Sequence, residues 1–213
     1  MKIELNIFTN CSQHAPKTDI IEKTYLSFVK TFGYHDYKIW LDKHPEGDRL
    51  FEYENNLNFK FGGPINITES LSDGYIQAIQ QSDADYLFML EHDWIFNDNI
   101  RHGLTAFTQS MRCQNLYHLR FNKRKNEPIK WDKTLTEFGL GANLRLCKTP
   151  VLSNNPHIID RKKYLEFIEL EYIVTMPGSK GLEEIISKQT HLNGAIYGPL
   201  GYPATVTHLD GRK

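Results

Sequence analysis

Gln81-Ser82-Asp83-Ala84-Asp85-Tyr86-Leu87-Phe88-Met89-Leu90-Glu91-His92-Asp93-Trp94 is the stretch that decides the fold. Its apolar run from Tyr86 to Leu90 does not alternate with polar residues, which predicts a strand buried on both faces, as in a parallel sheet. Acidic residues are disfavoured inside such a strand, so Glu91 and Asp93 should mark its carboxyl end, the edge at which open α/β sheets bind ligands. Two carboxylates one residue apart could share a hard divalent cation there, although a solvated acidic strand end explains the same pattern.

The composition places the chain among ordinary globular proteins. Its 213 residues suffice for one sizeable α/β domain, and its formal net charge of −1 gives no reason to expect nucleic acid as a partner. Cys11, Cys113 and Cys147 are odd in number and widely spaced, which predicts neither a zinc site nor a disulfide framework and favours a reducing, cytoplasmic location. The first residues indicate a strand and not a signal peptide, and no apolar stretch approaches the ~20 residues of a membrane span.

The residues around the opening stretch predict alternating strands and helices. A strand over 2–9, a helix over 19–32 capped by Thr18 and ended by Gly33, and a strand over 37–41 make a βαβ unit. The fold class is therefore single-domain α/β, with a Rossmann-like, mixed and mainly parallel sheet flanked by helices. The other expected elements are an ambiguous segment over 49–61 with a short strand at 58–61, a helix from 68 or 70 to about 81, a helix from Asn97 or Asp98 to about 111, a strand over 115–121, a surface loop over 122–136, short strands at 144–146, 156–159 and 204–207, and helices over 161–173 and 182–188.

The central segment resembles a known family. A helix that runs into a buried strand ending in Asp-x-Asp is the hallmark of GT-A-fold glycosyltransferases, and residues 71–93 are similar to that segment, with Glu91-His92-Asp93 in the motif position. The two opening strands, which end in Phe8-Thr9-Asn10 and Leu41-Asp42, are similar to the nucleotide-sugar half of that fold. The chain also resembles small glycosyltransferases of large algal viruses, including chlorovirus capsid-glycosylating enzymes. The motif departs from the family pattern because its first acid is Glu and a His stands between the acids.

The resemblance implies a metal-dependent enzyme whose donor is a nucleotide diphosphate sugar, most simply a UDP-sugar. Asp93 would be the principal ligand of Mn²⁺ or Mg²⁺, while Glu91 would bind the metal directly, through water, or the ribose hydroxyls, with His92 beside the nucleotide. His208 would complete the metal shell. Arg212 and Lys213 would pair with phosphate oxygens. An ordinary histidine in a polar tail is the alternative for His208.

Four further residues are implied at the donor. The resemblance suggests that Asp42 contacts the uracil or ribose, that Thr9 and Asn10 contact the nucleotide, and that Asp73 reaches the ribose or the donor sugar. The alternative for the strand ends is turn chemistry, because Asp and Asn are common where strands stop. A solvated helix face is the alternative for Asp73.

Two adjacent acids could serve the acceptor. In inverting members of the family a carboxylate placed like Glu183 or Glu184 deprotonates the acceptor hydroxyl, although acids are also favoured in the first turn of any helix. Asn154-Asn155-Pro156-His157 could line the acceptor site. The tail, with His208 followed by Gly and basic residues, is instead similar to retaining enzymes. Retention is slightly favoured because three residue types match, and the resemblance also implies a hexosyltransferase-type reaction.

The sequence thus predicts a glycosyltransferase that moves a sugar to a hydroxyl of a glycan or glycoprotein, with residues 1–100 as the nucleotide-sugar half and 101–213 as the acceptor half. The chain could also be one domain of a longer protein. Two alternatives stay open. A nucleotidyltransferase would share the sheet and metal, but residues 10–16 lack the Gly, Arg and Lys of its usual loop. A non-catalytic sugar- or nucleotide-binding module would release no nucleoside diphosphate.

Overall fold

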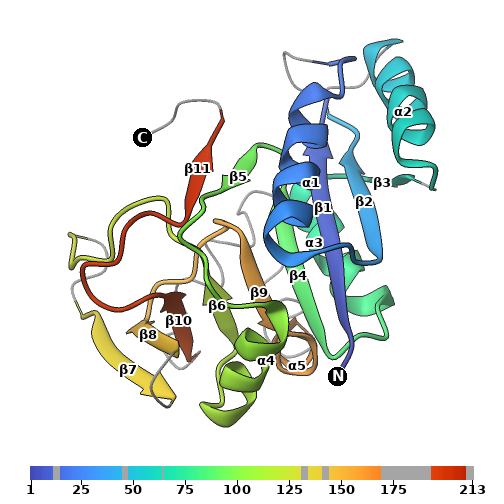
Figure 1. The fold of residues 1–213 in the computed structure, drawn as a ribbon. Helices are drawn as coiled ribbons and strands as arrows, with labels where there is room; N and C mark the ends of the chain where they lie inside the picture. Colours follow the sequence, from blue (N-terminus) through green and yellow to red (C-terminus); the bar gives the residue numbers. More distant parts are fainter. Residues whose placement is uncertain are drawn as a thin grey trace.

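A nine-stranded sheet forms the centre of the molecule (Figure 1). The structure, a computed structural model, describes residues 1–11, 15–44, 48–63, 65–130, 134–140, 144–168 and 193–209. The pairing directions show that seven of these nine strands run the same way and that β9 and β8 run against them. The sheet is therefore mixed and mainly parallel, as predicted. In the order in which they lie side by side, its strands are β3 (Ile65–Thr68), β2 (Tyr37–Asp42), β1 (Ile3–Asn10), β4 (Tyr86–Glu91), β9 (His157–Asp160), β6 (His118–Arg120), β10 (Gly194–Tyr197), β8 (Leu144–Thr149) and β7 (Thr136–Leu140).

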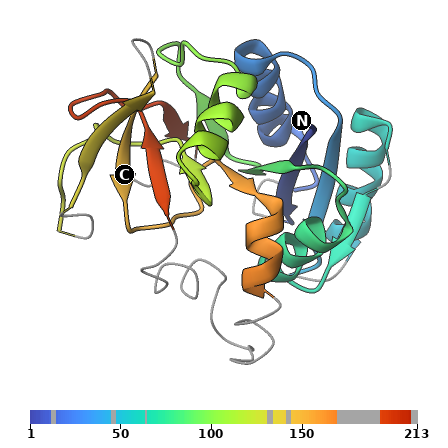
Figure 2. The same ribbon diagram turned by 90° about the horizontal axis from the view of Figure 1, so that it is seen from below.

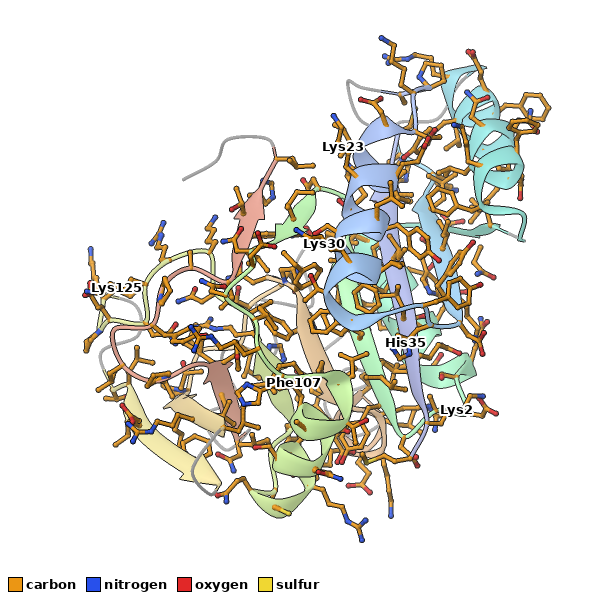
Figure 3. The ribbon with its side chains drawn as sticks, in the orientation of Figure 1. Lys2, Lys23, Lys30, His35, Phe107 and Lys125 are labelled. Atoms are coloured by element: carbon orange, nitrogen blue, oxygen red, sulfur yellow. The ribbon has the colours of Figure 1, made fainter. Side chains whose placement is uncertain are left out.

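Helices cover both faces of this sheet. One buried cluster contains residues of α1 (Asp19–Phe32), α2 (Asp48–Phe61) and α4 (Leu104–Cys113), and a second contains residues of α3 (Leu71–Gln81) and α5 (Arg161–Phe167). Figure 2 shows α1 and α4 on one side of the sheet and α3 and α5 on the other. Phe107 of α4, labelled in Figure 3, is fully buried, and its ring centroid lies 5.4 Å from that of Phe121. The molecule is a three-layer, single-domain α/β fold.

The central strand β4 is buried on both faces, as its unbroken apolar run predicts. Tyr86, Phe88 and Leu90 belong to the first cluster, while Leu87 and Met89 belong to the second. This alternation follows from the period of two in a strand, and it confirms that each face of β4 carries a layer of helices.

Local signals set the end of α1 and the start of α3. Gly33, with a φ of +83°, ends α1, and its amide donates to the carbonyl oxygen of Val29. Ser70 caps α3, because its side chain accepts a hydrogen bond from the Asp73 amide at 3.1 Å. Thr18 stands at the start of α1 as expected, but its hydroxyl bonds the Glu22 carboxylate and caps no backbone amide.

Several predicted boundaries are wrong. Residues 48–61 form one helix, so the strand expected at 58–61 is absent and β3 follows it at Ile65–Thr68. The helix expected from Asn97 or Asp98 begins at Leu104, because the Asn97 side chain instead donates to the Ala204 carbonyl and Asp98 pairs with Lys30. Strands β3, β7 and β10 were not predicted, nor was the short strand Trp94–Phe96. The predicted helix over 182–188 and the end of that over 161–173 lie outside the described residues.

All three cysteines are free thiols, and the sequence predicted no disulfide framework. Among the described helices, none combines the length and the apolar character that crossing a bilayer requires.

Candidate functional site

The carboxyl ends of three parallel strands meet at one edge of the sheet. The register places Asn10 at the end of β1 beside Asp42 at the end of β2, and Phe8 of β1 beside Glu91 at the end of β4. Parallel α/β sheets bind their ligands at this edge. The predicted strand-end residues therefore share one edge, as the sequence indicated.

A tight turn after β4 leads directly into a second, small sheet. The His92 amide donates to the carbonyl oxygen of Phe8 at 2.9 Å, and the Thr24 hydroxyl donates to the carbonyl oxygen of His92 at 2.6 Å. The chain then enters β5 (Trp94–Phe96), which pairs antiparallel with β11 (Val206–His208) so that Trp94 and His208 lie opposite one another. The turn thus brings Asp93 next to a segment near the other end of the chain.

Asp93 and His208 form a largely buried pair at this position. The imidazole Nε2 of His208 lies 3.3 Å from the carboxylate Oδ2 of Asp93, and the side chains of His208 and Asp93 are 9% and 13% exposed respectively. The Leu209 amide donates to the Asp93 carbonyl oxygen at 2.7 Å, and the rings of Trp94 and His208 meet edge-on with centroids 4.4 Å apart. Backbone pairing and ring packing therefore hold the carboxylate and the imidazole together.

The donor set of this pair suits a divalent cation. Asp93 Oδ1 is buried and has no hydrogen-bond partner among the described residues, which leaves one carboxylate oxygen able to accept a ligand. A carboxylate and an imidazole are ligands that Mn²⁺ accepts, and further positions could be filled by oxygens of a bound diphosphate. Within the described residues no three His, Cys, Asp or Glu side chains are grouped to hold a metal ion, so Glu91 does not complete a three-ligand site with this pair.

The other described site residues make local contacts. The Thr9 hydroxyl and the Tyr53 hydroxyl are 2.8 Å apart and buried, and burial raises the pKa of Tyr53 to about 12. Asn10 is exposed at the edge. Asp42 accepts hydrogen bonds from the backbone amides of His44 at 2.9 Å and Leu71 at 3.2 Å, so both carboxylate oxygens stabilise the loop and the start of α3.

Asp73 has a structural partner set of its own. Its carboxylate Oδ2 accepts from the Glu69 amide at 3.0 Å and from the Gln77 side chain at 2.9 Å. Together with the Ser70 cap, this arrangement satisfies amides at the start of α3 in the manner of a capping box. Contacts of Thr9, Asn10, Asp42 and Asp73 with a nucleotide stay predictions.

The predictions for Glu183, Glu184, Arg212 and Lys213 lie outside the described residues. The sequence analysis also missed Lys123, whose ammonium nitrogen lies 5.9 Å from the centroid of the Trp94 ring beside His208. Lys123 belongs to the run Asn122-Lys123-Arg124-Lys125, which looked like an ordinary solvated loop. Its concentration of positive charge directly after a strand end was the signal available.

Comparisons with known proteins show the fold. No protein-family model and no curated protein matches the chain. Residues 1–349 of S. aureus TarS in complex with UDP-GlcNAc match at a TM-score of 0.57 and 12% identity, over all of this chain and 62% of that chain. The same residues in complex with UDP match at a TM-score of 0.56 and 12% identity, over 97% of this chain and 60% of that chain. A mannose-1-phosphate geranyltransferase from Thermus thermophilus matches at a TM-score of 0.50 and 9% identity, over 97% of this chain and 76% of that chain.

The chain thus spans about three fifths of the length of these two TarS structures, which hold residues 1–349. The likeness covers nearly the whole of this chain, so it applies to the sheet and to both layers of helices. The fold is accordingly GT-A-like and of the Rossmann type, which confirms the predicted fold class.

Proposed function

We propose that this chain is a glycosyltransferase that moves a sugar from a UDP-sugar to a hydroxyl of a glycan or glycoprotein, with Mn²⁺ or Mg²⁺ at Asp93 and His208. The observation that carries the proposal is the Asp93–His208 pair, because it joins a carboxylate and an imidazole at the carboxyl edge of a GT-A-like sheet. The complex of S. aureus TarS with UDP-GlcNAc supports a UDP-sugar as the donor. The kinship with algal-virus enzymes stays a prediction.

A divalent cation at this pair would neutralise the charge of the nucleoside diphosphate as it leaves. The protein chain would contribute by holding the two metal ligands, Asp93 and His208, in place. The ladder between β5 and β11 fixes His208 opposite Trp94, and the amide of Leu209 ties the backbone of Asp93 to the same segment. The low exposure of both side chains reduces solvent screening and so strengthens their attraction for a cation.

The remaining roles follow from position. Asn10 and Asp42 would contact the nucleotide at the neighbouring strand ends, with Thr9 behind them. Glu91 would bind a metal-bound water or the ribose hydroxyls, and His92 would lie beside the nucleotide. Residues 1–100 would bind the donor and residues 101–213 the acceptor. Glu183 or Glu184 as the acceptor base, Arg212 and Lys213 as diphosphate ligands, and the retaining outcome complete the proposal.

Ligand binding and turnover test this proposal. Thermal unfolding is measured with UDP-GlcNAc and other UDP-sugars, with and without Mn²⁺, and released UDP is assayed with candidate acceptors. A donor that binds only the folded state should stabilise it by ~2.7 kcal/mol at a hundredfold excess over its dissociation constant. Failure of every donor to bind or to release UDP would contradict a glycosyltransferase function.

A substitution at Asp93 tests the proposed metal site separately. Asp93→Asn should fold normally, because it keeps the shape of the side chain, but should lose the Mn²⁺-dependent part of UDP binding. Asp36→Asn, which removes an equal charge from an exposed position, is the matched control and should bind as the unmodified protein does. Unchanged Mn²⁺-dependent binding in Asp93→Asn would contradict the metal site.

A further inference from the structure

A basic pocket of about 230 Å³ opens at the end of β6. Its charged lining residues are Arg120, Lys123, Arg124, Lys125 and Glu127, and these four cations and one anion sum to a formal charge of +3. The whole chain has a formal net charge of −1, so this lining concentrates positive charge at one place. Such concave, single-sign surfaces attract ligands of the opposite charge.

The loop that carries three of these cations is held firmly. Asn126 is 1% exposed, and its side-chain amide donates to the carbonyl oxygens of Tyr197 at 2.9 Å, Gly198 at 3.1 Å and Pro199 at 3.2 Å. Its backbone amide also donates to the carbonyl oxygen of Tyr202 at 2.9 Å. The basic side chains therefore project from a fixed backbone, which lowers the entropic cost of binding a ligand between them.

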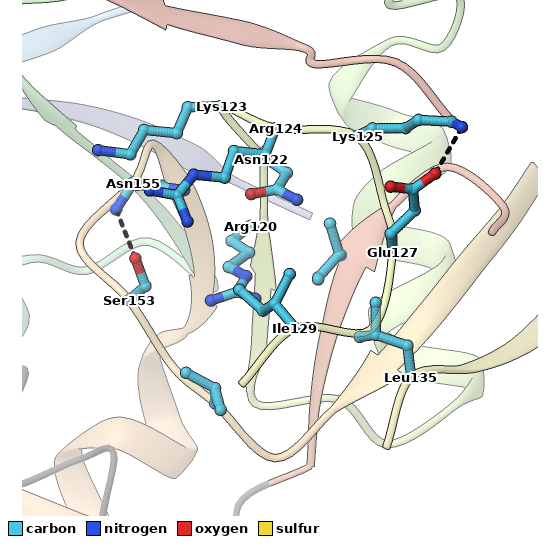
Figure 4. Close-up of a pocket in the computed structure, with 12 residues that line it drawn as sticks. Arg120, Asn122, Lys123, Arg124, Lys125, Glu127, Ile129, Leu135, Ser153 and Asn155 are labelled. Carbon is cyan, nitrogen blue, oxygen red and sulfur yellow. Dashed lines mark hydrogen bonds and ion pairs between the residues drawn. The ribbon is translucent and has the colours of Figure 1, made fainter. Parts of the chain in front are cut away.

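The cations do not all point the same way. Figure 4 shows the side chains of Lys123 and Arg124 directed toward the side of the pocket on which Asn155 lies, with Arg120 drawn below them. Arg120 is 6% exposed, so its charge lies at the buried end of the pocket. Lys125 extends the other way and pairs with Glu127 at 2.5 Å. Lys123 and Arg124 are thus the cations that a ligand entering the pocket would meet first, and Arg120 adds positive charge at its buried end.

The pocket adjoins the candidate functional site. Lys123 lines it, and its ammonium nitrogen also lies 5.9 Å from the centroid of the Trp94 ring, which packs against His208. The volume of about 230 Å³ is below the roughly 300–1,000 Å³ that pockets for whole small molecules occupy. It suits one charged group with part of a sugar ring better than a complete nucleotide sugar.

We infer that the basic pocket binds an anionic group, a phosphate or a carboxylate, of the acceptor, so that the acceptor is an acidic sugar or glycan. This inference rests on the proposed glycosyltransferase function. Arg and Lys side chains recognise both groups through charge-assisted hydrogen bonds, and Asn155 adds a neutral polar group to the same wall. The diphosphate of the donor offers the same chemistry, so the two sources have to be separated by experiment.

The test compares matched sugars by calorimetry at low and high salt. Glucose 6-phosphate and glucuronate should bind the unmodified protein, glucose should not, and added salt should weaken the binding. The double variant Lys123→Gln and Arg124→Gln should lose about tenfold or more of this affinity, because charge-assisted hydrogen bonds are lost. The control double variant Arg112→Gln and Lys148→Gln removes two equal charges from exposed positions on α4 and β8 and should bind normally.

Each contrary result identifies what is wrong. The inference would be overturned if glucose bound as tightly as the acidic sugars. It would also be overturned if neither acidic sugar bound. If the double variant lost affinity for UDP while keeping it for the acidic sugars, the pocket would belong to the donor and the inference would again be overturned. Absence of UDP-sugar binding and of UDP release in the unmodified protein would instead contradict the proposed function, and with it the acceptor role, even where acidic sugars bind.

Discussion

Lowering the pH should destabilise the fold through two stacked and buried histidines, His118 and His157. Their ring centroids are 4.3 Å apart. His157 Nδ1 donates to the carbonyl oxygen of Asn155 at 2.7 Å, and His118 Nδ1 lies 2.8 Å from the hydroxyl oxygen of Tyr164. Burial lowers the pKa of His157 to about 4 and holds the pKa of His118 well below its usual value, and the charge of Arg120 acts in the same direction.

These shifts fix both the sign and the size of the effect. An imidazole in the unfolded chain has a pKa of about 6.5, so the unfolded state takes up protons before the folded state does. The stabilisation is therefore complete above pH 6.5 and is lost as the pH falls toward 4. At pH 5 the loss amounts to about 2 kcal/mol for His157, from the ~5–15 kcal/mol of a typical domain, and His118 acts in the same direction.

Urea unfolding at pH 7.5 and pH 5.0 measures this loss. In His157→Asn the side-chain amide can still donate to the Asn155 carbonyl but cannot titrate, so the drop in unfolding free energy between the two pH values should shrink by about 2 kcal/mol. The constant cost of the smaller side chain cancels, because each variant is compared only with itself. His44→Asn, at an exposed position, is the control and should show the full drop.

An equal drop in His157→Asn and in the unmodified protein would refute this reasoning. It would mean that acid acts through other groups, and that the buried imidazole has the same affinity for protons in the folded and unfolded states. If the drop in unfolding free energy were reduced as much in His44→Asn as in His157→Asn, burial of the histidine would not be the cause.

Two further predictions concern the loop and the acceptor base. Asn126→Ala should lower the free energy of unfolding by about 1–3 kcal/mol, because buried carbonyl groups lose their donor, and urea unfolding beside the exposed control Asn10→Ala measures it. If Glu183 or Glu184 is the base, its Gln variant should lose about 10²–10⁴-fold in turnover while donor binding persists. Losses under tenfold in both variants would exclude a base role and favour retention, which NMR of the product anomer would check.

Elements β1, α1, β2, α3 and β4 could be predicted from the sequence because their signals are local. Gly33 ends α1 and Ser70 begins α3 through hydrogen bonds to residues within four positions along the chain. The unbroken apolar run that ends at Glu91 marks a strand buried on both faces, whatever its neighbours are. These elements needed no knowledge of the rest of the chain.

The elements that the sequence did not predict depend on distant contacts. Gly194–Tyr197 forms the fully buried strand β10 only because β6 and β8 flank it, and four residues carry no periodicity strong enough to predict this. Asn97 did not begin a helix, because its side-chain amide donates a hydrogen bond to the distant Ala204 carbonyl oxygen. The types of residue at the candidate site could be predicted, but the adjacency of Asp93 and His208 came from family resemblance and not from any local pattern.

One segment near the end of the chain positions both the metal-ligand candidates and the basic pocket. Val206–His208 pairs with β5 and so places His208 beside Asp93. Immediately before it, the Thr205 hydroxyl accepts from the Asn122 amide at 2.9 Å, which anchors the start of the basic loop. A shift of this segment would therefore move the imidazole and the loop together. In the proposed reaction donor and acceptor have to meet within bonding distance, so this shared support would keep the two proposed sites in register.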